Sequence, residues 1–123
     1  MTERFGADFD SELEEQDQAD KIRFLNDQFR QTFTGGNLFI TPGIQALPDP
    51  IPKEALVAIQ QFDNFSPDND PYGHHDFGEV EIQGVRIWFK IDCYDLNLEY
   101  GSTDATDPNV TTRVMTIFLP EEY

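Results

Sequence analysis

The sequence predicts a single α+β domain with a mainly antiparallel sheet of four to five strands and two helices packed on one face. Two segments in the first half of the chain repeat apolar residues at helical spacing, whereas the second half alternates apolar and polar residues as strands do. A length of 123 residues suits one domain with one core, and 11 Phe, 4 Tyr and 1 Trp can fill that core.

The first 19 residues are expected to form a flexible acidic arm ahead of a domain that spans residues 20–123. The arm is dense in Asp and Glu, and Arg4 is its one basic residue. Its apolar residues Phe5, Phe9 and Leu13 are spaced by four, which allows the arm to become helical when it binds a partner.

Two helices and a short strand are predicted at the start of the domain. The first helix covers about residues 20–33, and a Gly-Gly pair follows it as a stop signal. A strand at 37–41 comes next, and the second helix covers about residues 53–64, with Pro52 suited to its first turn. The apolar stripe of the first helix consists of Ile22, Leu25, Phe29 and Phe33.

The clearest local prediction is a hairpin whose two-residue turn is Gln83-Gly84. This register places Ile82 opposite Val85 and Glu79 opposite Trp88. A slip of one residue would mix the two faces, so the register is strongly favoured. One face then collects Val80, Ile82, Val85, Ile87, Phe89 and Ile91, and the other collects Phe77, Glu79, Glu81, Arg86, Trp88 and Lys90.

Two further strands are predicted towards the end of the chain. Residues 96–100 alternate between apolar and polar side chains, which indicates a strand with one buried face. Residues 110–119 are apolar on both faces, which is typical of a central strand. Loops rich in Pro, Asp and Gly are expected at 66–75 and 101–109.

The net charge is the strongest compositional signal for function, because 24 acidic residues against 8 basic ones give −16. Such a charge disfavours nucleic acid and anionic membranes as partners and favours basic protein surfaces. A domain of this length is roughly 35 Å across, and B-DNA of that length carries about 20 phosphate charges, so the protein has the charge needed to imitate DNA. The candidate partner-binding residues are Glu12, Glu14, Glu15, Asp17, Glu79, Glu81 and Trp88.

The loop of residues 68–79 suggests an alternative function, a divalent-metal site. Its spacing of carboxylates partly matches a calcium-binding loop, although Tyr72 stands where Asp or Asn belongs. The opposing interpretation is a Pro/Asp turn whose side chains cap its own amides, with His75 and Asp76 paired to order it. The candidate metal ligands are Asp68, Asp70, His75, Asp76 and Glu79.

Catalysis is disfavoured, since no complete catalytic set is visible. Asp76 with Asp92, or Cys93 with His75, offers a pair, but no nucleophile elbow, oxyanion hole or phosphate loop accompanies either pair. We therefore expect a protein without a cofactor, with a divalent metal as the alternative. A single cysteine, the lack of a long apolar run and an acidic N-terminus predict a cytoplasmic protein without an internal disulfide.

Four short runs of sequence carry a family resemblance: 65–71, 75–78, 90–95 and 111–113. They resemble a bacterial domain of unknown function, numbered 3768, over about residues 20–123, with Cys93 in place of an expected Tyr. The resemblance implies carriage on plasmids and other mobile elements. With the charge, it predicts an acidic inhibitor that binds a basic surface of a nucleic-acid-handling protein, such as a DNA-mimic anti-restriction or anti-CRISPR protein. Homodimer formation is left open.

Overall fold

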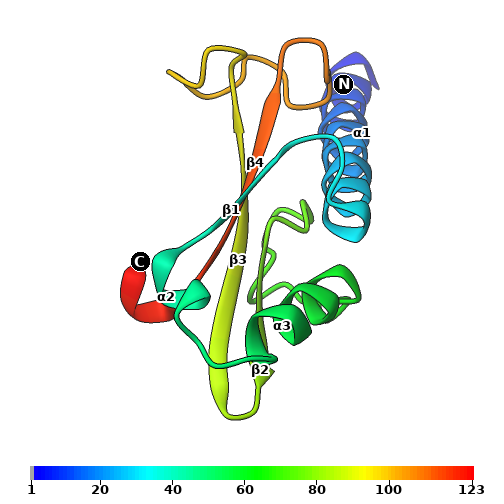
Figure 1. Ribbon diagram of the computed structural model, residues 1–123. Coiled ribbons are helices and arrows are strands. Elements are labelled where there is room, and N and C mark those ends of the chain that lie inside the picture. The colour runs from blue at the N-terminus through cyan, green and yellow to red at the C-terminus, as the bar shows by residue number, and fades with distance from the viewer. Residues whose placement is uncertain (1) are drawn as a thin grey trace.

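A computed structural model describes the backbone of residues 2–123 and the side chains from residue 13 onward. The predicted α+β class is confirmed, with three α-helices in place of the expected two and a four-stranded sheet (Figure 1). The elements in chain order are α1 (Thr2–Thr32), β1 (Asn37–Ile40), α2 (Pro42–Gln45), α3 (Ile51–Gln60), β2 (Phe77–Ile82), β3 (Val85–Tyr94), β4 (Thr112–Phe118) and the 3-10 helix η1 (Pro120–Glu122).

The sheet has the strand order β1-β4-β3-β2 and is mixed. The pairs β2–β3 and β3–β4 are antiparallel, whereas β1 pairs with β4 in parallel. The expectation of a mainly antiparallel sheet is therefore correct for two of its three strand pairs and wrong for β1. No tight turn connects β1 to β4, so the sequence pattern fixed neither the partner nor the direction of that strand.

The hairpin of β2 and β3 has the predicted register at every position. Ile82 pairs with Val85 and Glu79 with Trp88, as the turn Gln83-Gly84 requires. Both turn residues have positive φ, +50° at Gln83 and +83° at Gly84, which matches the right-handed twist of two-residue hairpins. The strand β4 lies between β1 and β3, so the prediction of a central strand there is also confirmed.

Three boundary or element predictions are wrong. The first helix begins at Thr2 instead of near residue 20, and α2, a short helix capped by the Thr41 hydroxyl, follows β1 where only a break was expected. The predicted strand at 96–100 is a loop in which Leu96 and Leu98 are exposed. Alternating side chains form a strand only where a neighbouring strand can pair with them, and the two edges of this sheet are β1 and β2. The division between a flexible arm and a domain at residue 20 stays a prediction.

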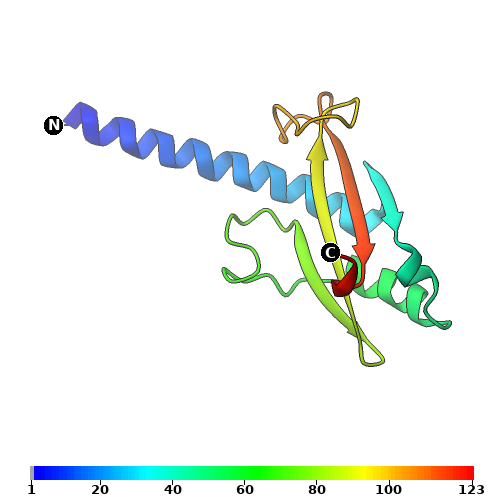
Figure 2. The ribbon, with the colours of Figure 1, turned by 90° about the vertical axis from the view of Figure 1, so that its left-hand side faces the viewer.

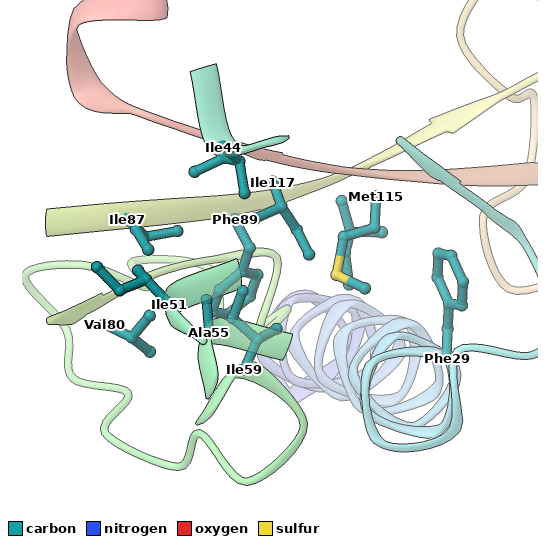
Figure 3. Packing of buried hydrophobic residues seen from close by; sticks show 11 residues of the cluster. Phe29, Ile44, Ile51, Ala55, Ile59, Val80, Ile87, Phe89, Met115 and Ile117 are labelled. Carbon is teal, nitrogen blue, oxygen red and sulfur yellow. The ribbon is translucent and has the colours of Figure 1, made fainter. Parts of the chain in front are cut away.

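The core joins the sheet to the helices, as Figure 3 shows for the buried side chains. Ala55 and Ile59 of α3 and Phe29 of α1 belong to one cluster with Phe89 and Met115 of the sheet, and each of them is at most 1% exposed. Burying each large apolar side chain contributes about 1.5–3 kcal/mol. This cluster anchors the second half of α1, and the packing of two helices on one face stays a prediction. Within residues 2–123, no helix is both long and apolar enough to cross a membrane.

Candidate functional site

The first half of α1 extends away from the sheet, and only its second half lies against the domain (Figure 2). Glu14, Glu15 and Asp17 are exposed there, and Leu13 is 49% exposed despite being apolar. The predicted contact residue Glu12 has a side chain outside the described residues. Three of the four predicted acids on this segment are therefore placed together on a free helix.

A second polar site joins the loop between α3 and β2 to α1 through His75. The Nδ1 atom of His75 lies 2.8 Å from Oδ1 of Asp27, and its Nε2 atom lies 3.7 Å from Oδ2 of Asp70. The imidazole also stacks on the ring of Phe65, with centroids 3.8 Å apart and planes 5° apart. His75 therefore connects two carboxylates that lie 43 residues apart in sequence, whereas the turn interpretation paired it with Asp76.

The buried carboxylate of Asp70 shapes the loop itself. Its Oδ1 atom accepts hydrogen bonds from the backbone N–H groups of His74 at 3.0 Å and His75 at 3.1 Å. These bonds fix the left-handed backbone of His75, whose φ is +54°. Asp70 is 8% exposed, so the loss of these bonds would leave polar groups without partners. The prediction of a turn whose side chains cap its own amides describes Asp70 correctly.

Arg30 completes this polar site from α1. Its Nη1 atom donates to the same Asp27 oxygen at 2.8 Å, its guanidinium lies 5.2 Å from the centroid of the Phe65 ring, and its side chain is 2% exposed. The Nε atom of Arg30 is buried without a hydrogen-bond partner. A cavity of about 380 Å³ opens beside Asp27, Arg30 and His75. We call this set of Asp27, Arg30, Phe65, Asp70 and His75 the His75 cluster.

The five candidate metal ligands do not all lie together in the structure. Asp70 and His75 lie together in the His75 cluster, and Asp68 is exposed on the loop. Glu79 is on the hairpin, where Arg86 and Trp88 hold its carboxylate. Among the side chains that the structure describes, no three of the ligand types His, Cys, Asp and Glu are grouped so as to hold a metal ion.

Asp76, the remaining candidate metal ligand, is partly buried just before β2. Burial raises the pKa of the Asp76 carboxyl, an effect that nearby His74 opposes and Asp70 and Asp92 reinforce. Burial also raises the pKa of the Cys93 thiol, which makes this cysteine a poorer nucleophile at neutral pH. The pairing of Cys93 with His75 has no support, because His75 is held by Asp27 and Asp70.

Sequence reasoning missed the buried pair of Asn26 and Arg113. Arg113 Nε donates to Asn26 Oδ1 at 2.8 Å, and Asn26 Nδ2 donates to the carbonyl of His74 at 2.9 Å. Both residues are at most 3% exposed. The signal was present, because Asn26 falls within the apolar stripe of α1, four residues after Ile22 and three before Phe29. These bonds hold the loop and the sheet against α1.

The polar face of the hairpin carries the remaining predicted contact residues. Trp88 is half-buried against the rings of Phe77, Phe118 and Tyr123, at centroid distances of 5.4, 6.0 and 6.3 Å. Its Nε1 atom donates to Glu79 at 2.6 Å, and this bond, with a second from Arg86, lowers the pKa of Glu79. Glu81 is exposed. Of Glu79, Glu81 and Trp88, Glu81 alone can meet a partner without breaking one of the side-chain hydrogen bonds described here.

The fold and sites together describe a small α+β domain with a projecting acidic helix. Residues 40–122 match the family described as "Protein of unknown function (DUF3768)", and since this match covers most of the chain, the chain belongs to that family. The match begins at the end of β1, so α1 lies before it. Searches of the curated proteins and of the solved structures found no match.

Proposed function

We propose that the protein is an acidic inhibitor that binds a basic surface of a nucleic-acid-handling protein through α1, in the manner of a DNA-mimic anti-restriction or anti-CRISPR protein. The observation that supports this proposal is the half of α1 that projects from the sheet (Figure 2), on which the carboxylates of Glu14, Glu15 and Asp17 are exposed. A helix with so few tertiary contacts is marginally stable by itself, so a partner that neutralises its charge would also stabilise it.

The charge density of this helix is comparable with that of DNA. Glu14, Glu15 and Asp17 occupy four helical residues, or about 6 Å at a rise of roughly 1.5 Å per residue. That is one charge per about 2 Å, against one per about 1.7 Å along B-DNA. Glu14 and Asp17, three residues apart, lie on one side of α1, where a protein surface that binds DNA through Lys and Arg would meet both carboxylates, whereas Glu15 points to another side of the helix. Glu81 and the Trp88 face of the hairpin are candidates for a second contact.

A capture experiment from host lysate tests this proposal. The immobilised wild-type protein is expected to retain a DNA- or RNA-handling protein at low salt and to release it at high salt, because screening weakens exposed charge contacts. A triple variant with Glu14→Gln, Glu15→Gln and Asp17→Asn should lose the partner.

A matched control removes the same number of charges elsewhere. Asp49, Asp68 and Glu99 are exposed and lie outside α1, so Asp49→Asn, Asp68→Asn and Glu99→Gln together change the net charge equally. This control should keep the partner. Equal loss of the partner in both triple variants would show that total charge, and not α1, governs binding. Retention of the partner that is the same at low and high salt would contradict the proposal.

The second candidate function is a metal-binding module or a metal-dependent enzyme that uses the loop of residues 68–79. The approach of Asp70 to His75, at 3.7 Å, is the observation that favours it. A rise in melting temperature with Ca²⁺, Mg²⁺, Mn²⁺ or Zn²⁺, lost in Asp70→Asn, would support this function. Metal analysis of protein purified without chelator that finds no metal, together with no thermal shift, would remove it.

A further inference from the structure

A cleft of about 440 Å³ lies between the acidic helix and the loop that precedes β2. One wall comes from α1 and includes the carboxylate of Glu15 and the apolar side chains of Ala19 and Ile22. The opposite wall comes from the loop and consists of Tyr72 and His74. The cleft is adjacent to the projecting half of α1, so a partner bound along that helix would pass over it.

The loop wall is held in place by α1 itself. Arg23 Nη1 donates to the carbonyl of Gly73 at 3.2 Å, and Asn26 Nδ2 donates to the carbonyl of His74 at 2.9 Å. Gly73 has a φ of +70°, which L side chains rarely adopt, and so permits the chain reversal beside Tyr72. Two hydrogen bonds to the two residues that follow Tyr72 therefore fix the backbone that presents its ring.

Tyr72 is the unusual member of this wall. It is 77% exposed, although it stands beside a cleft with apolar side chains in it. Its ring centroid lies 5.9 Å from that of His74, with the planes tilted by 30°, so His74 supports the ring from one side only. Exposed aromatic rings that share a cleft with a carboxylate are suited to contacts that a cationic side chain buries.

We propose that this cleft receives an arginine side chain of the basic partner, and this inference rests on the proposed function. The methylene groups of the arginine would pack on Ala19 and Ile22, as long basic side chains do on apolar surface. Its guanidinium would stack on the Tyr72 ring and bond to Glu15. The net charge of −16 favours a cationic occupant over an anionic one.

The same chemistry selects arginine over lysine. A planar guanidinium stacks on an aromatic ring and forms two parallel hydrogen bonds to one carboxylate, whereas an ammonium group does neither. The long-range attraction of an acidic protein for both residues is equal. A preference for arginine that depends on Tyr72 is therefore specific to this cleft and is separable from general charge attraction.

The test uses fluorescence anisotropy with labelled nona-arginine and nona-lysine peptides and the full chain at about physiological salt. Wild type should bind nona-arginine more tightly than nona-lysine. Tyr72→Ala should weaken nona-arginine binding by about two- to fivefold, the range expected for an exposed cation–π contact, and should reduce the preference for arginine. Tyr100→Ala is the matched control, because Tyr100 is 73% exposed on the loop after β3.

A second matched pair tests the carboxylate. Glu15→Gln and Glu99→Gln remove one exposed charge each, and only Glu15→Gln should reduce the preference for arginine. Circular dichroism of each variant confirms that it is folded. If both peptides bind but Tyr72→Ala equals Tyr100→Ala, the arginine cleft is refuted while the proposed function stands. If wild type captures no basic partner from lysate and binds neither peptide, both are refuted.

Discussion

The substitution Asp27→Asn removes the carboxylate on which the His75 cluster depends. Asp27 Oδ1 lies 2.8 Å from both Arg30 Nη1 and His75 Nδ1. Asn has nearly the same shape but no charge, so the change leaves the guanidinium of Arg30, which is 2% exposed, beside a neutral amide. The Nε atom of Arg30 already lacks a hydrogen-bond partner, so the substitution adds to a hydrogen-bonding deficit that this side chain already has.

The size of the effect follows from the exposure of the two partners. Breaking a fully buried ion pair costs about 3–5 kcal/mol, whereas an exposed pair contributes about 0–1 kcal/mol. Asp27 is 27% exposed and the Asn amide oxygen can still accept one hydrogen bond, so we expect a loss of about 1–3 kcal/mol of unfolding free energy. For a domain of this size, at about 3–6 °C per kcal/mol, that corresponds to a melting temperature lower by roughly 3–18 °C.

Urea unfolding, followed by circular dichroism and by the fluorescence of the single Trp88, measures this loss. Asp20→Asn is the matched control, because Asp20 forms the same kind of i,i+3 ion pair on α1 with Arg23, where the two side chains are 45% and 33% exposed. The control should leave the midpoint nearly unchanged. Equal shifts in the two variants, or no shift in Asp27→Asn, would refute the role given to the buried Arg30.

Three further predictions concern the rest of the fold. Burial raises the pKa of Asp76, so the folded protein loses stability as the pH rises through that raised value. Asp76→Asn should therefore be more stable than wild type at pH 7, and this gain should disappear below the usual pKa of 3.8. Urea unfolding of both proteins across pH 3–8 would show the difference. Gly78→Ala should lower the unfolding free energy by about 1–3 kcal/mol, because a Cβ there would lie 2.5 Å from the Phe89 ring; an unchanged urea midpoint would contradict this packing. Gln83→Asn should raise stability by on the order of 0.5–1 kcal/mol, since Asn accepts the φ of +50° more readily, and a lower melting temperature would argue against the turn geometry.

The sequence predicted those parts of the fold that depend on local patterns. The hairpin could be predicted to the residue, because one turn, Gln83-Gly84, and one alternation of faces determine its register. The strand β4 could be recognised as central from apolar residues on both faces. The pairing of β1 with β4 could not, because 77 residues separate Asn37 from its partner Val114, and no local pattern selects the partner.

The His75 cluster shows why the site was harder to predict than the fold. His75 and Asp70 were both singled out, but their partners Asp27 and Arg30 lie on α1, more than 40 residues earlier. A helical charge pair at i,i+3 is usually a solvated surface pair, and only the docking of the loop buries this one. The exposed acids of α1 were easier to predict, since their proposed role needs charge and exposure and no precise partner within the chain.

Competition with DNA tests the central claim most directly. The basic protein captured from lysate is loaded with labelled duplex DNA, and the acidic protein is added at increasing concentration. If α1 imitates DNA, wild type displaces the duplex, the variant with Glu14→Gln, Glu15→Gln and Asp17→Asn displaces it poorly, and the control triple variant behaves as wild type. A stable complex that contains the partner, the DNA and the acidic protein together would contradict the account.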